Sequence, residues 1–587
     1  MQINRFAVLG VLASFLTACG GDLNIDGGGS TFTPPSDTPV SNSPSGPCAF
    51  YFDANGDLKQ GDFNGADCNY DAAFVDFNNP ILGDLTIADT IVGAHIFSGS
   101  IFVGESFDTL AETEAAGIMR GGDGATLTIE PGVTIAIETP QDFIAINRGS
   151  QIIAQGTADA PITFTSEVDV RGLTTAEQVG TWGGMVIAGF GFLNGCEYLP
   201  GFDFTDPNSE LVLPEGSACS DLLEGTEGGT SVRYGGTVPD DSSGILEFVV
   251  VKHAGFAIDN DNELNGITFG AVGSGTQLSN VEIYSNLDDG IEFFGGGADL
   301  DFYLGMYIRD DSIDIDQGYY GTITNALVIQ AGGGLDEADP TGAHCVESDG
   351  SSSGEILDVN FANGYVSQAT INNLTCIISA KGPGVAGNND AGAGINAEES
   401  HFLTLNRSIV TTAYAVDASI DATGSDDSPI PAAQLPFINY CFQLEDDEDL
   451  ENAANGLINI NTTIFACADL AANGSEDGDI LLPMGAAFPA GTTGTEFLAA
   501  QDNVLFMTAD DGTTPPDSAG GLGEVGILDS FYSVPLADMM IDGTPVSFTD
   551  TTATVIGAVT RDNDWTQGWT FGLNEGARDQ ELWFELP

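Results

Sequence analysis

Two short acidic motifs carry most of the chemistry that this sequence offers. The motif DDGIE at residues 288–292 and the motif DDSID at residues 310–314 share one pattern and begin 22 residues apart. If they lie on neighbouring strands, the two leading Asp residues of one motif stack about 5 Å from those of the other. Carboxylates at that distance repel one another, so they either hold protons or bind cations. Hard oxygen ligands suit Ca²⁺, and we expect Ca²⁺ at Asp288, Asp289, Asp310 and Asp311.

Two other interpretations of these residues stay open. One is a solvated row of acidic turns without a bound ion. The other is an enzyme, a polysaccharide lyase or glycoside hydrolase in which Asp310, Asp311 and the adjacent Arg309 are catalytic. The chain lacks the Arg-Ile-Lys strand and the Gly-His-Gly turn of polygalacturonase-like chains, and it has only 12 Lys and Arg to hold an acidic polysaccharide. The enzyme is therefore the alternative, and the main prediction assigns no catalytic residue.

The charge of the chain excludes several partners. Of 587 residues, 87 are Asp or Glu and 12 are Lys or Arg, which gives a formal net charge of −75. Such a surface repels phosphate backbones, so we expect no nucleic-acid partner. The Gly-rich stretches lack the Lys of a phosphate loop, so we expect no nucleotide. The hydrophobic fraction of 42% is ordinary for a folded chain and excludes wholesale disorder.

The first residues indicate export and a lipid anchor. Arg5 precedes the apolar stretch 6–16, which is too short to cross a bilayer as a stable helix. It ends in Leu-Thr-Ala-Cys at 16–19, which looks like the bacterial lipobox, where the peptide is cleaved and the Cys is lipidated. We expect lipidation at Cys19, with a conventional signal peptide as the alternative. Because Gly20 replaces the Asp that signals inner-membrane retention, we expect the outer membrane, on the cell surface or on its periplasmic face.

The other eight cysteines form four local couples. An even number in an exported chain indicates disulfides. The couples are separated by 20, 23, 31 and 26 residues, and no C-x-x-C motif or His cluster indicates a metal site instead. We expect the bonds Cys48–Cys68, Cys196–Cys219, Cys345–Cys376 and Cys441–Cys467.

The elements that must position the acidic motifs are short strands in a repeat. Runs rich in β-branched residues, bounded by Gly, Asn and Asp, dominate from about residue 83 to 470. Similar segments at 244–248, 266–269, 290–294 and 312–316 begin 22, 24 and 22 residues apart. A period of twenty-odd residues with two or three short strands is typical of one coil of a parallel β-helix. We predict an all-β, right-handed solenoid in which these four segments are successive neighbours in one sheet.

Composition and period divide the chain into five parts. We predict a signal peptide at 1–18, a lipidated flexible tether at 19–47, rich in Gly, Ser, Thr and Pro, and a disulfide-closed N-terminal region or cap at 48–114. The β-helix follows at 115–471, with inserted loops at 193–229 and 415–436. Residues 472–587 lose the period and form a C-terminal cap or appended region, in which Trp565 and Trp569 cover the end of the solenoid or offer a sugar-stacking platform.

Five longer phrases resemble one family. They are LTIEPGVTI (127–135), TWGGMVIAG (181–189), DNELNGITFGAVGSGT (261–276), DDGIEFFGG (288–296) and IGAVTRDNDWTQGWT (556–570). They resemble a group of exported, often lipidated β-helical proteins of marine and related bacteria. The resemblance implies the fold and the location and supplies no catalytic residue. Together with the acidic motifs, it favours a surface-anchored binding or structural lipoprotein, adhesin-like or binding extracellular matrix or glycan, whose expected partner is a polysaccharide or a surface protein.

Overall fold

The computed structural model describes residues 43–573 with internal gaps, and every element below belongs to the compact unit Pro44–Pro587. The gaps are residues 177, 207, 227–230, 257–263, 331–342, 351–359, 361, 379–392, 413–439, 445–446, 467–471, 474–493, 506–531, 539, 542–543 and 546. The predicted signal peptide, most of the tether and Cys19 lie outside the described residues.

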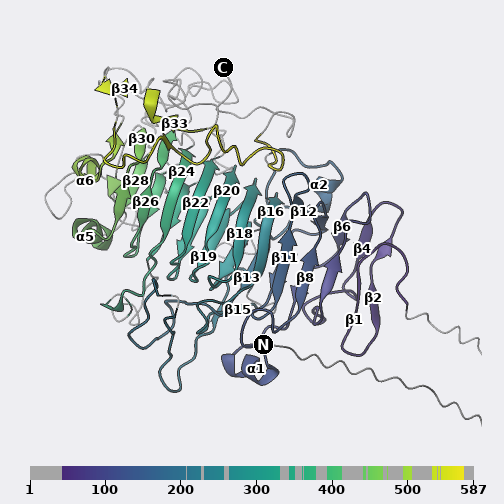
Figure 1. The fold of residues 1–587 in the computed structure, drawn as a ribbon. Coiled ribbons are helices and arrows are strands. Elements are labelled where there is room, and N and C mark those ends of the chain that lie inside the picture. The colour runs from purple at the N-terminus through teal and green to yellow at the C-terminus, as the bar shows by residue number, and fades with distance from the viewer. Residues whose placement is uncertain are drawn as a thin grey trace, which may run out of the picture. The chain divides into compact units, whose positions relative to one another are not determined.

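A ten-stranded parallel sheet forms one side of the molecule (Figure 1). In spatial order its strands are β7 (Ile101–Val103), β10 (Ile144–Ile146), β13 (Met185–Ala188), β17 (Ile267–Gly270), β19 (Ile291–Phe294), β21 (Ile313–Asp316), β23 (His344–Ser348), β25 (Ala393–Ala397), β28 (Tyr440–Leu444) and β31 (Ala472–Asn473). Each strand pairs in parallel with the next, and the chain passes through the other side of the molecule between them.

The other side is an eighteen-stranded sheet, parallel except where β3 meets β4. Its strands are β3 (Asp62–Phe63), β4 (Cys68–Tyr70), β5 (Leu85–Ile87), β6 (His95–Phe97), β8 (Thr126–Ile129), β9 (Thr134–Ile137), β11 (Gln151–Gln155), β12 (Ile162–Ser166), β16 (Gly244–Lys252), β18 (Gln277–Tyr284), β20 (Leu300–Met306), β22 (Thr322–Ile329), β24 (Thr370–Ile378), β26 (Thr404–Asn406), β27 (Ile409–Thr412), β29 (Asn459–Asn461), β30 (Ile464–Ala466) and β32 (Val504–Leu505). One strand of the first sheet and the following strands of the second make one coil. The structure therefore confirms the predicted parallel β-helix.

The remaining elements are short and lie outside the two large sheets. The helices are α1 (Leu110–Ala116), α2 (Glu167–Val170), α5 (Asp447–Asn455), α6 (Gly494–Ala500) and the 3₁₀-helix η2 (Leu536–Asp538). Four strand pairs, all antiparallel, are β1 (Phe50–Phe52) with β2 (Leu58–Gln60), β14 (Asp221–Leu222) with β15 (Arg233–Tyr234), β33 (Val534–Pro535) with β36 (Val555–Ile556), and β34 (Met540–Ile541) with β35 (Thr544–Pro545).

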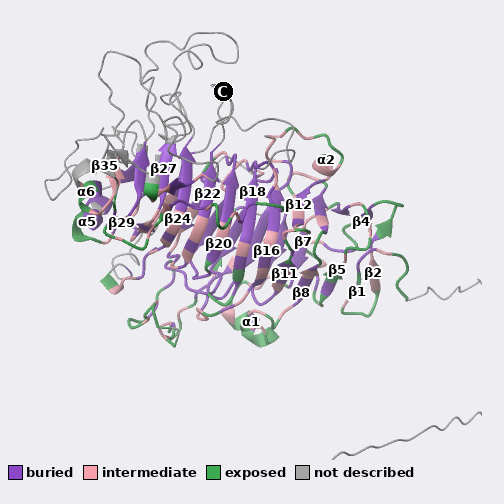
Figure 2. Cartoon of the chain, turned by 45° about the horizontal axis from the view of Figure 1, so that its top comes forward, coloured by how far each residue is buried: buried purple, intermediate pink, exposed green. Residues whose placement is uncertain are grey.

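Apolar side chains from successive coils stack inside the solenoid. Ile267, Ile291 and Ile313 occupy one register position in the first sheet, and all are fully buried. Phe269 and Phe293 stack beside them with ring centroids 4.9 Å apart. Because side chains alternate along a strand, every second residue of these strands points outward. Figure 2 shows that burial continues along the strands of successive coils.

The long strands of the second sheet bend at one residue in the left-handed region. Phe248, Asn280, Phe302, Asn325 and Asn373 have φ between 50° and 61° and lie at equivalent positions of successive coils. This conformation costs an L-residue roughly 1–2 kcal/mol. Two of the Asn side chains offset that cost, because the Asn373 amide donates to Asn325 at 3.0 Å and the Asn325 amide donates to the preceding coil.

One of the four segments predicted to share a sheet lies elsewhere. Segments 266–269, 290–294 and 312–316 contain β17, β19 and β21, which are successive neighbours as predicted. Segment 244–248 belongs to β16, which pairs with β11 and β18 in the second sheet. The prediction was wrong here because segments 244–248 and 266–269, which lie in different sheets, begin 22 residues apart, close to the 22 to 24 residues that separate equivalent strands of successive coils.

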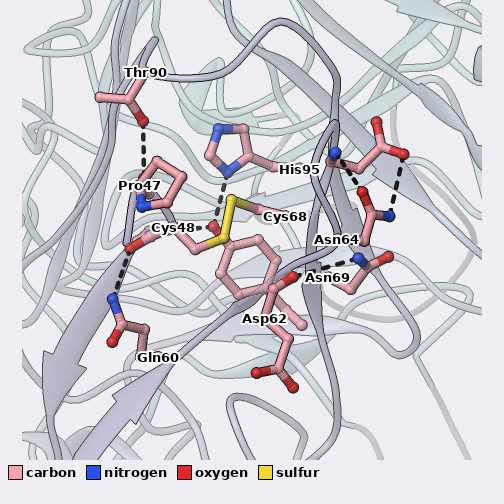
Figure 3. The surroundings of a disulfide bond; sticks show 12 residues. Pro47, Cys48, Gln60, Asp62, Asn64, Cys68, Asn69, Thr90 and His95 are labelled. Carbon is pink, nitrogen blue, oxygen red and sulfur yellow. Dashed lines mark hydrogen bonds between the residues drawn. A yellow bond between two sulfur atoms is a disulfide. The ribbon is translucent and has the colours of Figure 1, made fainter. Parts of the chain in front are cut away.

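Three of the predicted disulfides are present: Cys48–Cys68, Cys196–Cys219 and Cys345–Cys376. The first closes the N-terminal strands, where Gln60 donates to the carbonyl of Cys48 at 3.3 Å (Figure 3). The third joins β23 to β24 inside the core. Cys467, the predicted partner of Cys441, lies outside the described residues.

A C-terminal segment, Val555–Leu573, packs against the outer face of the second sheet. Trp565 contacts Phe302 of β20, and Trp569 contacts Phe248 of β16, with ring centroids 5.5 and 5.7 Å apart. Both indoles are at least nine-tenths buried. These two residues therefore cover the side of the solenoid, and the interpretations that placed them over its end or in a sugar-stacking platform were wrong.

Candidate functional site

A column of polar side chains runs along the turns that precede β17, β19, β21 and β23. We call Asn265, Asp289, Asp311 and His344 the turn column. The backbone N–H of Asp289 donates to Asn265 Oδ1 at 3.1 Å, and that of Asp311 donates to Asp289 Oδ1 at 3.0 Å. The backbone N–H of His344 donates to Asp311 Oδ1 at 2.6 Å. In each step of the column, the backbone N–H of one coil thus holds a polar side chain of the preceding coil.

A second column stands beside the turn column on the outer face of the ten-stranded sheet. This strand column consists of Thr268, Glu292, Asp314, Glu347, Asn396 and Gln443, one from each of β17, β19, β21, β23, β25 and β28. Its members point outward because the residues on either side of them, such as Ile291 and Phe293, fill the core. Asn396 Nδ2 donates to Glu347 Oε1 at 3.1 Å, so a side-chain hydrogen bond joins these two members of the column.

The two columns, together with the adjacent Asp288 and Asp310, bring carboxylates and one imidazole into three groups. In each group the potential ligand atoms lie within 4.8 Å of one another. The groups are Asp288–Asp289–Asp310, Asp289–Glu292–Asp314 and Asp311–His344–Glu347. Of the four predicted Ca²⁺ ligands, three therefore meet, and Asp311 lies with His344 and Glu347 instead.

Burial and mutual repulsion act on the middle group. The pKa values of Asp289, Glu292 and Asp314 lie well above their ordinary values, first because of burial and then because of neighbouring carboxylates. Two ionised carboxylates 4.8 Å apart repel by about 3.5 kcal/mol at an effective dielectric constant of about 20. Among the described residues, no Lys or Arg forms an ion pair with any of the three, and Asp314 Oδ1 is buried without a hydrogen-bond partner. The group can hold protons or a cation.

The third group has a different charge balance. Burial raises the pKa of Glu347, but the charge and hydrogen bond of His344 outweigh it and lower that pKa to about 2. The pKa of Asp311 is raised, first by burial and then by Glu347. His344 Nδ1 lies 2.9 Å from Asp311 Oδ1 and 3.3 Å from Glu347 Oε1. The imidazole therefore lies between two carboxylates.

The inserted loop after β13 flanks the acidic face. It is closed by Cys196–Cys219 and carries the β14–β15 hairpin, whose Tyr234 hydroxyl donates to Gln317 Oε1 at 2.8 Å. The charge of Glu224 in this loop adds to the rise in the pKa of Glu292. Buried aromatic residues of the loop, among them Phe192 and Tyr198, pack against one another.

The alternative catalytic residues occupy different environments. Asp310 is exposed, and its backbone carbonyl accepts from Ala343 at 3.0 Å. Asp311 is buried against His344, and Arg309 is partly buried. The three are consecutive in the chain, but Asp310 and Asp311 belong to different groups.

Four residues of these groups were not predicted as site residues from the sequence: Glu292, Asp314, His344 and Glu347. Strand alternation could have revealed Glu292 and Asp314, because each follows an inward Ile in the two acidic motifs. No simple signal reveals His344, because it lies 33 residues after Asp311 rather than one regular period.

A solenoid of parallel strands with outward carboxylates on one sheet defines the class as a parallel β-helix protein. Residues 110–479 match the family model described as the pectate-lyase like beta helix domain, and the chain belongs to that family. No curated protein and no solved structure gives a significant match. In the part of the chain that the structure describes, no helix combines the length and apolar character needed to cross a membrane.

Proposed function

We propose that this protein is a lipid-anchored binding or structural β-helix of the cell surface whose acidic turns are stabilised by Ca²⁺. The observation that carries the proposal is the adjacent pair of carboxylate groups, Asp288–Asp289–Asp310 and Asp289–Glu292–Asp314, which share Asp289 and draw ligands from two coils. An ion held there links neighbouring coils.

The chemistry of the side chains favours a hard cation. Ca²⁺ takes six to eight oxygen ligands from carboxylates, carbonyls and water in flexible geometry. Five carboxylates in two overlapping groups supply such oxygens without nitrogen or sulfur. Binding of Ca²⁺ replaces protons on the carboxyls whose pKa is raised, so affinity increases with pH. Asp311 is not included, because its neighbours are His344 and Glu347.

The location rests on the sequence. The lipobox-like motif ending at Cys19 supports a lipid anchor in the outer membrane, and the tether rich in Gly, Ser, Thr and Pro supports a β-helix held away from the lipid. Gly20 in place of an inner-membrane retention residue supports the outer membrane, with the cell surface as the proposed face and the periplasmic face as the alternative. A polysaccharide or a surface protein is the proposed partner.

Calcium titration tests the cation site. We expect isothermal titration calorimetry of the chelator-treated chain to show Ca²⁺ binding that Asp289→Asn weakens at least tenfold, because Asp289 belongs to both groups. Asn at this position still accepts the backbone N–H of Asp311, so the coil contact is kept. Glu247→Gln, which removes one charge from β16, is the control. Equal affinity in wild type and Asp289→Asn contradicts the site.

A second candidate function is a polysaccharide lyase or glycoside hydrolase. It is favoured by membership of the pectate-lyase like beta helix family together with carboxylates on the outer face of a sheet. A glycan array and a depolymerisation screen, each with and without Ca²⁺, distinguish the two functions. Binding without cleavage supports the main proposal. Cleavage that is lost in Asp310→Asn supports the enzyme.

A further inference from the structure

The third group differs from the other two in one ligand type. Asp311 precedes β21, His344 begins β23, and Glu347 lies three residues later on the outer face of β23. None of these residues belongs to the two groups of the calcium proposal. An imidazole nitrogen with two carboxylate oxygens is a ligand set for a borderline metal ion rather than for Ca²⁺.

One of the two distances from His344 Nδ1 to a carboxylate matches the spacing of ligands around a shared metal ion, and the other is shorter. Nδ1 lies 2.9 Å from Asp311 Oδ1 and 3.3 Å from Glu347 Oε1. Nitrogen and oxygen ligands at about 2.0–2.1 Å from a tetrahedral Zn²⁺ are about 3.3 Å apart. A single Nδ1–H lies in the ring plane and can point at only one acceptor. Two carboxylates close to one ring nitrogen are therefore better explained by a cation between all three atoms than by one hydrogen bond.

Neighbouring groups hold two of the three side chains, those of Asp311 and Glu347, in place. The backbone N–H of His344 donates to Asp311 Oδ1, and Asn396 Nδ2 donates to Glu347 Oε1 at 3.1 Å. Such outer contacts orient metal ligands and raise affinity. The side chains of His344 and Asp311 are each 5% exposed, whereas that of Glu347 is 23% exposed. Two of the three side chains are thus buried, and solvent reaches the third.

We propose that Asp311, His344 and Glu347 bind a divalent first-row transition metal ion such as Zn²⁺. The site extends the proposed function, because it places a second kind of ion one coil further along the same face, but its ligands are separate from those of Ca²⁺. An imidazolium between two carboxylates is the competing arrangement, and it binds no metal.

The test uses the full chain after chelator treatment. We expect calorimetry to show one equivalent of bound Zn²⁺ with a dissociation constant of 10 µM or lower. This affinity corresponds to a binding free energy of roughly 7 kcal/mol or more and separates a specific site from weak surface binding. Co²⁺ in its place is expected to give the visible absorption of a tetrahedral or five-coordinate ion. His344→Ala is expected to weaken Zn²⁺ binding at least 100-fold, and Glu347→Gln at least tenfold.

Calcium affinity is the control for folding in both variants. We expect it to stay within twofold of wild type, because neither residue belongs to the calcium groups. Absence of Zn²⁺ binding in wild type, or unchanged Zn²⁺ affinity and Co²⁺ spectrum in both variants, overturns the proposal. If the wild type binds Zn²⁺ but not Ca²⁺, only the calcium proposal fails. Calcium affinity then cannot serve as the control, so the folding of the variants is checked by circular dichroism.

Discussion

Replacing Asp314 by Asn has effects of opposite sign with and without calcium. Asp314 belongs to the strand column, and one of its carboxylate oxygens lies within 4.8 Å of carboxylate oxygens of Glu292 and Asp289. Its Oδ1 atom is buried without a hydrogen-bond partner. Each ionised pair at that distance costs about 3.5 kcal/mol at an effective dielectric constant of about 20. Protonation relieves part of this cost, so we expect Asp314→Asn to stabilise the metal-free chain by roughly 1–3 kcal/mol at pH 8.

The pH dependence of that gain has a defined sign. Since the folded pKa of Asp314 is raised, the folded chain binds more protons than the unfolded chain above the ordinary carboxyl pKa, and its stability falls as pH rises. The stabilisation by Asp314→Asn should therefore shrink between pH 8 and pH 5. In saturating Ca²⁺ the same variant loses a ligand, and a tenfold loss of affinity corresponds to about 1.4 kcal/mol of destabilisation.

Thermal and urea unfolding followed by circular dichroism, in EDTA and in Ca²⁺, measure both effects. Glu247→Gln is the matched control, because it removes one carboxylate from a strand of the second sheet where Gln155 already donates to it. We expect it to change stability by less than about 0.5 kcal/mol in either buffer. If Asp314→Asn shifts stability in the same direction in both buffers, the electrostatic reasoning is refuted.

Three further predictions concern other parts of the chain. His95 is buried, and burial lowers its pKa to about 4. The stability contributed by its neutral form is therefore complete above pH 6.5 and lost as pH falls through 4. His95→Gln should remove up to about 3 kcal/mol of this loss of stability in acid, measured by urea unfolding from pH 7 to 4. Trp569→Ala should destabilise the C-terminal segment by about 3 kcal/mol and speed hydrogen exchange of residues 555–573, whereas Ala at the exposed Phe50 should have little effect. Cys19→Ser should abolish incorporation of a clickable fatty acid in the native host, and persistent labelling would exclude this anchor.

The sequence was sufficient for the regular part of the β-helix. The acidic motifs at 288–292 and 310–314 are one coil apart with no insertion between them, so spacing alone placed Asp289 next to Asp311. Local cysteine spacing likewise predicted three disulfides, because bonds within or between adjacent coils join residues close in sequence. Strand alternation would also have revealed Glu292 and Asp314.

Irregular segments concealed the rest. His344 follows Asp311 by 33 residues rather than the regular 22 to 24, and a fixed period cannot align residues across such an insertion. Segment 244–248 has the composition of the first-sheet strands, yet hydrogen bonding places it in the second sheet. The side position of Trp565 and Trp569 depends on contacts across hundreds of residues, which local patterns do not encode.

The C-terminal segment changes how such a solenoid should unfold. In a stack of coils each unit touches only its neighbours, so the ends can fray one unit at a time. Here the backbone N–H of Ala558 donates to Thr375 Oγ1 of β24, and the backbone N–H of Phe571 donates to Glu282 Oε2 of β18. One ribbon thereby spans the coils of β18, β20, β22 and β24. A force applied at the carboxyl end must first detach this segment from the second sheet. The coils that it contacts then lose the contacts that they share through it. We therefore expect one large unfolding event, followed by stepwise unfolding of individual coils.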